Sequence, residues 1–181
     1  MAADMGHGSA RGGNRWRIAV WGAAACLLLL PLVAMQFDAT GVVWTGSDFL
    51  VMGAMLAMAC GMWELGMRMS RNRAYRAAVA IAVLAGFLMT WANLAVGIIG
   101  NENNPLNLLF FGVLAIGIVG SLVARFRPRG MAWAMVAMAI AQALVCAVTL
   151  LVGEMTFVVS GFFTAAWLVS AALFRKAARE S

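Results

Sequence analysis

Residues 92–119 read ANLAVGIIGNENNPLNLLFFGVLAIGIV, an apolar run that is broken at 100–107 by GNENNPLN. The interruption contains four asparagines, a glutamate and a proline. Asparagine at 104 is a residue type that caps helices, and Pro105 suits a first helical turn, where the missing N–H would have had no partner. The pattern therefore predicts a sharp turn between two apolar helices, and such a turn needs no ligand to explain it.

The same alternation of apolar runs and short polar breaks extends over the chain of 181 residues, of which 64% are hydrophobic and 11% charged. Soluble domains average about half apolar and about a quarter charged residues. Six runs are each long enough to cross a hydrocarbon core of ~30 Å as a helix. These runs are Ile18 to Met35, Phe49 to Met67, Ala77 to Gly100, Leu106 to Ala124, Met131 to Val152 and Phe157 to Phe174.

Backbone groups in lipid must be hydrogen-bonded within their own segment, so the six runs predict helices. We therefore expect an all-α fold, a bundle of six transmembrane helices at 18–174. The Gly-rich residues 1–17 predict a flexible cytoplasmic tail, and 175–181 a short C-terminal one. The first run exceeds the 7–15 residues or so of a signal-peptide core, which favours a retained helix.

The basic residues indicate the orientation of these helices. All 13 lysines and arginines lie before the first run, between the second and third, between the fourth and fifth, or after the sixth. In the other three connections every charged side chain is acidic: Asp38, Asp48, Glu102 and Glu154. Because basic loops stay on the cytoplasmic side, both termini are expected there, with GNENNPLN outside. The net charge of +6 is explained by basic residues that fix the topology and can contact anionic headgroups. We therefore expect no nucleic-acid partner.

An internal repeat is one interpretation of the glycine and basic positions. At an offset of 59, Gly53, Gly61 and Arg68 match Gly112, Gly120 and Arg127; at an offset of 49, Gly112, Ser121 and Arg127 match Gly161, Ser170 and Lys176. Three helical hairpins in parallel repeat would produce this pattern. Chance would also produce it, because the chain has 19 glycines and topology places basic residues at these helix ends.

Residues for catalysis are scarce. The single histidine, His7, lies in the N-terminal tail, and no HExxH, Ser/His/Asp set or phosphate-binding glycine loop is present. General acid–base chemistry usually needs a histidine or a carboxylate pair in a site. We therefore expect a protein that is not an enzyme, with no catalytic residues, no cofactor and no metal site.

Four side chains in the spans are candidates for a polar pocket: Asn93, Gln142, Trp167 and Glu64. Amides at lipid depth most often bridge helices, and Glu64 can pair with Arg68 one turn further along its helix. Ionisable and polar groups inside a membrane also mark solute pathways. Both interpretations stay open: interhelical contacts, or a pocket formed by these four residues.

The stretches WTGSDF, NRAYRAAV, NLAVGIIGNENNPLN and ARFRPRGMA resemble an uncharacterised family of small bacterial multi-pass inner-membrane proteins. The resemblance covers Trp44 to the C terminus and implies a multi-helix architecture in the bacterial inner membrane; it implies no activity, ligand or site residue. Two functions remain: an accessory or structural membrane protein, or a small transporter or channel. The expected partner is the lipid bilayer, and a membrane-protein partner or a homo-oligomer remains open.

Overall fold

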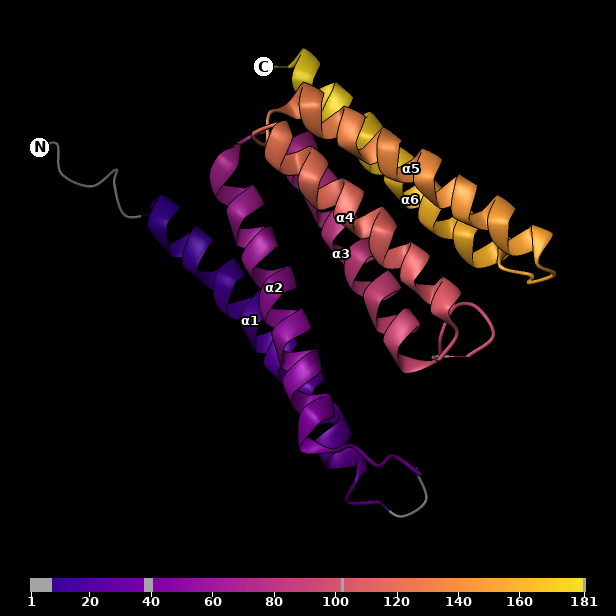
Figure 1. Ribbon diagram of the computed structural model, residues 1–181. Helices are drawn as coiled ribbons and strands as arrows, with labels where there is room; N and C mark the ends of the chain where they lie inside the picture. The colour runs from indigo at the N-terminus through magenta and orange to yellow at the C-terminus, as the bar shows by residue number, and fades with distance from the viewer. Residues whose placement is uncertain (1–7, 38–40, 102, 181) are drawn as a thin grey trace, which may run out of the picture. The chain divides into compact units, whose positions relative to one another are not determined.

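The computed structural model describes residues 8–37, 41–101 and 103–180, and side chains from Trp16 onward (Figure 1). The prediction for His7 lies outside these residues. In the described part, the regular elements are helical: α1 (Gly8–Ala34), α2 (Gly46–Met69), α3 (Arg73–Ala95), the 3-10 turn η2 (Pro105–Asn107), α4 (Leu108–Val123), α5 (Pro128–Leu151) and α6 (Phe157–Arg179). The predicted all-α fold is confirmed, and six helices are long and apolar enough to cross a membrane.

The helices begin where local sequence can satisfy free backbone N–H groups. In the first turn of α2, Asp48 Oδ2 accepts hydrogen bonds from the backbone N–H and the hydroxyl of Thr45, which precedes the helix, both at 2.7 Å, as in a capping box. Before α3, Asn72 Oδ1 accepts from the N–H groups of Ala74 and Tyr75 at 2.8 and 3.1 Å. Pro128 occupies the first position of α5, where it has no hydrogen bond to lose.

Three helix ends differ most from the sequence expectation. The helix expected to reach Gly100 ends at Ala95, because Gly97 and Gly100 adopt φ values of +71° and +66°, which glycine reaches without steric cost. Helix α6 continues to Arg179, through most of the expected C-terminal tail, since Lys, Ala and Arg are good helix formers. Helix α1 begins at Gly8, inside the expected N-terminal tail, and its candidate span is Trp16–Ala34.

The chain divides into two compact units, Met1–Glu64 and Leu65–Ser181. In the second unit α5 packs on α6, α6 on α3 and α4 on α5, with a smaller contact between α3 and α4. Its core is apolar and centres on large buried side chains: Tyr75, Met89, Phe110, Trp167 and Phe174. We call this the four-helix unit. It contains three of the four candidate pocket residues.

The first unit contains α1 and α2 up to Glu64. Many of its exposed side chains are apolar, among them Leu27, Leu29 and Leu30 of α1. The two helices meet at Gly53, where an added Cβ would lie 3.6 Å from Leu28 Cδ2. Exposed leucines over the length of a candidate span are expected of a helix that faces lipid.

Candidate functional site

Asn93 and Asn107 fasten the turn between α3 and α4. The buried Asn93 donates from Nδ2 to the backbone oxygen of Asn107 at 2.9 Å. The Asn107 amide oxygen accepts from the N–H groups of Ile98 and Ile99, at 3.1 and 2.9 Å. Its amide nitrogen donates to the carbonyls of Ile99 and Asn101, at 3.3 and 2.7 Å. Four backbone groups of the turn that follows α3 are thus satisfied by one side chain.

Sequence analysis did not single out Asn107. The available signal was its place at the end of GNENNPLN, directly before the apolar run of α4. An amide there can reach back over the turn, and its four hydrogen bonds make it the organising residue of this connection.

Gln142, in the second half of α5, is hydrogen-bonded to Ser160, in the first turn of α6. Its Nε2 atom donates to Ser160 Oγ at 3.3 Å, and both side chains are buried. Two helical turns towards the end of α5, the hydroxyls of Thr149 and Thr156 are hydrogen-bonded to each other. These contacts have the form expected of interhelical polar links.

Trp167 is 1% exposed and lies on the buried face of α6, between Ser160 and Ser170. The hydroxyl of Ser170 donates to the carbonyl of Ala78 at 2.9 Å, which aligns α6 with α3. At 1.5 Å per residue, Trp167 lies about 10 Å from Ser160 along α6. The polar residues of α6 therefore occupy successive levels of the four-helix unit.

Asn93 occupies a further level. It lies about 22 Å along α3 from Ala78, whereas Ser160 lies about 15 Å along α6 from Ser170. Since Ser170 is bonded to Ala78, the helical rise places Asn93 nearer the α3–α4 turn than the Gln142–Ser160 pair. The structure places Asn93, Gln142 and Trp167 in one helical unit, at three separate heights.

One polar atom of each of these three side chains is buried without a hydrogen-bond partner: Asn93 Oδ1, Gln142 Oε1 and Trp167 Nε1. Exchanging the oxygen and nitrogen of Gln142 would only change which of them meets Ser160, so one amide atom stays unpaired in either assignment. A buried polar group without a partner costs about 1–3 kcal/mol. A water molecule or small polar solute that hydrogen-bonded to one of these atoms would remove this cost.

Glu64 belongs to the first unit and is tied to α1. Its Oε1 atom accepts from Arg17 Nε at 2.8 Å and from Trp21 Nε1 at 2.9 Å. Its side chain is 17% exposed. The sequence pointed to Arg68 as a partner and gave no signal for the contacts with α1. A pocket shared by Glu64 with the three residues of the four-helix unit stays a prediction.

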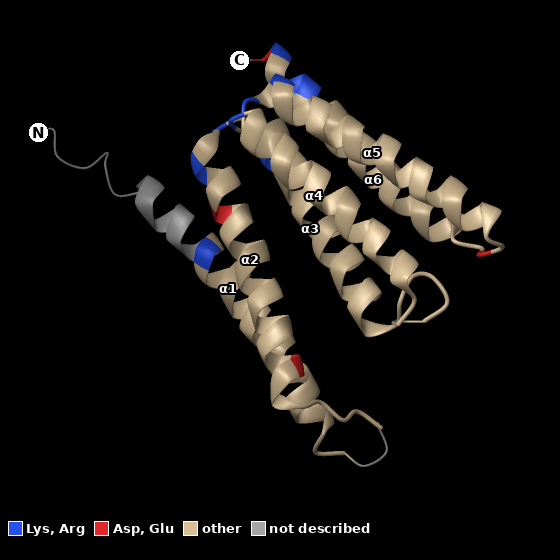
Figure 2. Cartoon of the chain, viewed as in Figure 1, with Lys and Arg blue, Asp and Glu red and all other residues tan. Residues whose placement is uncertain are grey.

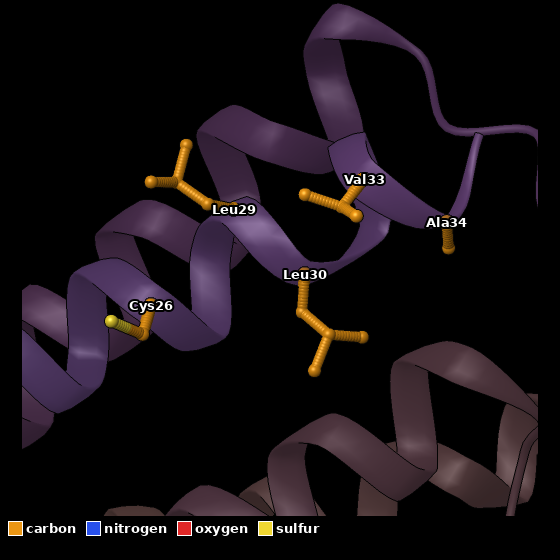
Figure 3. A pocket seen from close by; sticks show the side chains of 5 residues that line it. All are labelled: Cys26, Leu29, Leu30, Val33 and Ala34. Carbon is orange, nitrogen blue, oxygen red and sulfur yellow. The ribbon is translucent and has the colours of Figure 1, made fainter. Parts of the chain in front are cut away.

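A hollow on the surface of α1 has a different character (Figure 3). It is lined by Cys26, Leu29, Leu30, Val33 and Ala34, all from one helix. Its lining is almost wholly apolar, so it suits an acyl chain better than a polar solute. None of the four candidate residues lines it.

Metal-binding side chains do not gather in the part of the chain that the structure describes, where no three of His, Cys, Asp and Glu come together. Comparison of the chain with protein-family models, with curated proteins and with solved structures gave no match, so no family is identified.

Proposed function

We propose that this chain is a multi-pass protein of the bacterial inner membrane that works without catalysis, as an accessory or structural protein. In this proposal the buried polar groups hold the helices together. The surfaces that face lipid or neighbouring proteins carry the function. Both termini lie in the cytoplasm.

The observation that carries the proposal is the separation of the polar contacts. Asn93 is bonded to the α3–α4 turn and Gln142 to Ser160, while Trp167 lies among apolar side chains at another level. Residues that bind one solute must converge on it, usually in a concave pocket. Separate contacts in a closely packed core support a role in holding helices together.

The distribution of charge supports the proposed orientation. In the four-helix unit the basic residues lie at one end, where α3 and α5 begin and α4 and α6 end (Figure 2). The opposite end carries the GNENNPLN turn and Glu154. Because basic loops are retained in the cytoplasm, this distribution supports an orientation with the first end inside and the second outside.

The unpaired atoms of Asn93, Gln142 and Trp167 favour the alternative, a small transporter or channel. Two amide oxygens and one indole N–H could receive water or a small polar solute as it passes along α3, α5 and α6. Orphaned polar groups at lipid depth are costly, and a pathway would give them partners.

Thermal unfolding of two variants distinguishes the two functions. The double variant Gln142→Leu/Ser160→Ala replaces a hydrogen-bonded pair by apolar groups, a change that can be nearly neutral for stability. Asn93→Ala is the second variant. Wild type and both variants are purified in detergent, and each is screened with ions and polar metabolites.

The accessory proposal expects the solute screen to be flat for all three proteins. It also expects Asn93→Ala, which removes the donor to the backbone oxygen of Asn107, to lower the free energy of unfolding by about 1–3 kcal/mol. A solute that raises the wild-type melting temperature by mass action, and loses that effect in both variants, would replace the accessory role by the transport role.

A further inference from the structure

The basic end of the four-helix unit contains a cation held against an exposed tryptophan. The guanidinium carbon of Arg175, on α6, lies 5.6 Å from the ring centroid of Trp133, on α5. Trp133 is 69% exposed, so the pair lies on the outside of the helix bundle. Stacking on an indole leaves the edge of a guanidinium free, with its N–H groups pointing outward.

Two more arginines lie on the same faces of these helices. Arg129 precedes Trp133 by four residues on α5, and Arg179 follows Arg175 by four residues on α6. Side chains four residues apart on a helix are neighbours, about 5–6 Å apart at Cβ. Both arginines are exposed. The four side chains form what we call the Arg–Trp site: Arg129, Trp133, Arg175 and Arg179.

The surroundings leave this site positive. Glu180, the acidic residue nearest in sequence, is engaged by Asn72, whose Nδ2 donates to Glu180 Oε2 at 2.9 Å. Arg76, at the same end, stabilises the connection before α3 by donating to the carbonyls of Ser70 and Met67, at 2.8 and 3.1 Å. Among the described residues, no hydrogen bond or ion pair gives Arg129 or Arg179 an acidic partner.

The height of the site is that of a lipid headgroup. Trp133 lies near the start of the α5 candidate span and Arg175 near the end of the α6 span. Tryptophan gathers at the boundary between headgroups and acyl chains, and long arginine side chains reach from there to the phosphate level. A guanidinium edge matches two phosphate oxygens at once.

We propose that the Arg–Trp site binds the headgroup of an anionic phospholipid. Arg175, fixed by Trp133, bonds the phosphodiester through its free edge, while Arg129 and Arg179 supply further positive charge. Trp133 packs against the glycerol region. The site requires only that the chain spans a membrane, and it holds for either function considered above.

Binding of phosphatidylglycerol to the full-length protein in neutral detergent, followed by native mass spectrometry, tests the site. Phosphatidylcholine serves as the uncharged comparison lipid. The variants are Arg175→Gln, Trp133→Ala and Arg175→Lys, with Arg73→Gln as the matched control. Arg73 is exposed at the same end of the unit but lies on α3, outside the site.

General attraction between a basic surface and an anionic lipid predicts about fivefold weaker binding for each arginine removed, wherever it lies. The Arg–Trp site predicts a loss of about tenfold or more for Arg175→Gln. It also predicts a loss of about three- to fivefold for Trp133→Ala, which changes no charge. Arg175→Lys should bind with intermediate affinity, because lysine keeps the charge and loses the planar fork.

Equal losses in Arg175→Gln and Arg73→Gln, with Trp133→Ala unchanged, would overturn the site and leave only general attraction. Displacement of the lipid by soluble glycerol phosphate at the same concentration as the lipid would overturn the assignment to a lipid. All substituted side chains are exposed, so each variant should keep the wild-type circular dichroism spectrum.

Discussion

The side chain of Asn107 makes four hydrogen bonds to three residues of the turn that precedes it. Replacing it by alanine leaves the N–H groups of Ile98 and Ile99 without their acceptor, and Ile99 is fully buried. We expect Asn107→Ala to lower the free energy of unfolding by about 2–3 kcal/mol. Thermal unfolding in detergent measures the change, at roughly 2–4 °C per kcal/mol for a chain of this size.

The matched control is Asn103→Ala in the same turn, because Asn103 is exposed. A surface substitution of this kind should change stability by no more than about 0.5 kcal/mol. Equal melting temperatures for Asn107→Ala and Asn103→Ala would mean that the hydrogen bonds of Asn107 do not hold the turn.

At the scale of single side chains, the sequence predicts candidate residues but not their contacts. Asn93, Gln142 and Trp167 could be selected as candidates because a polar or indole group in an apolar run is conspicuous. Their partners could not be predicted, because Asn93 reaches Asn107 and Gln142 reaches Ser160 through the loop geometry and the helix register. Those depend on tertiary packing, which a linear pattern does not encode.

The contact between α4 and α5 depends on which glycines face it. An added Cβ at Gly120 would lie 2.9 Å from Ala134 Cβ and 3.4 Å from its Cα, so the helices would have to move apart. We expect Gly120→Ala to destabilise the protein by about 1–3 kcal/mol, measured by thermal unfolding.

Gly112 on the same helix is the control, since an added Cβ there meets nothing within 4 Å. Gly112→Ala should be neutral or stabilising by up to about 1 kcal/mol, from helix propensity. A loss of stability as large in Gly112→Ala as in Gly120→Ala would contradict the packing.

Two glycines that the repeat would match have different surroundings. An added Cβ at Gly61 meets nothing within 4 Å, whereas one at Gly120 would lie 2.9 Å from Ala134 Cβ. The repeat itself stays a prediction.

The pairing of α1 with α2 is held at Glu64 by Arg17 and Trp21. Arg17 is 58% exposed at its side chain, so the ion pair is partly screened. A double-mutant cycle of Glu64→Gln and Arg17→Gln should give a coupling energy of about 0.5–1 kcal/mol in thermal unfolding. Glu154→Gln, in the α5–α6 turn, is the single-site comparison. Strict additivity of the Glu64 and Arg17 changes would show that the pair contributes nothing.

Across the chain, hydropathy predicted the number and approximate places of the helices. The prediction succeeded because lipid imposes one length and one kind of backbone pairing on every span. Helix ends were predicted less well: α3 stops at Ala95, where two glycines leave the helical conformation, and α6 runs on to Arg179. The division into two compact units had no signal in hydropathy, because the spans of both units are strongly apolar.

Six membrane crossings with the arginine-rich connections in the cytoplasm are the central prediction for this chain. The most direct test is cysteine labelling in bacterial spheroplasts, using a chain in which Cys26, Cys60 and Cys146 are replaced by alanine. Asn103→Cys and Arg127→Cys are introduced one at a time. A membrane-impermeant maleimide should label position 103 in intact spheroplasts and position 127 only after lysis. Labelling of position 127 before lysis, with position 103 protected, would contradict the account.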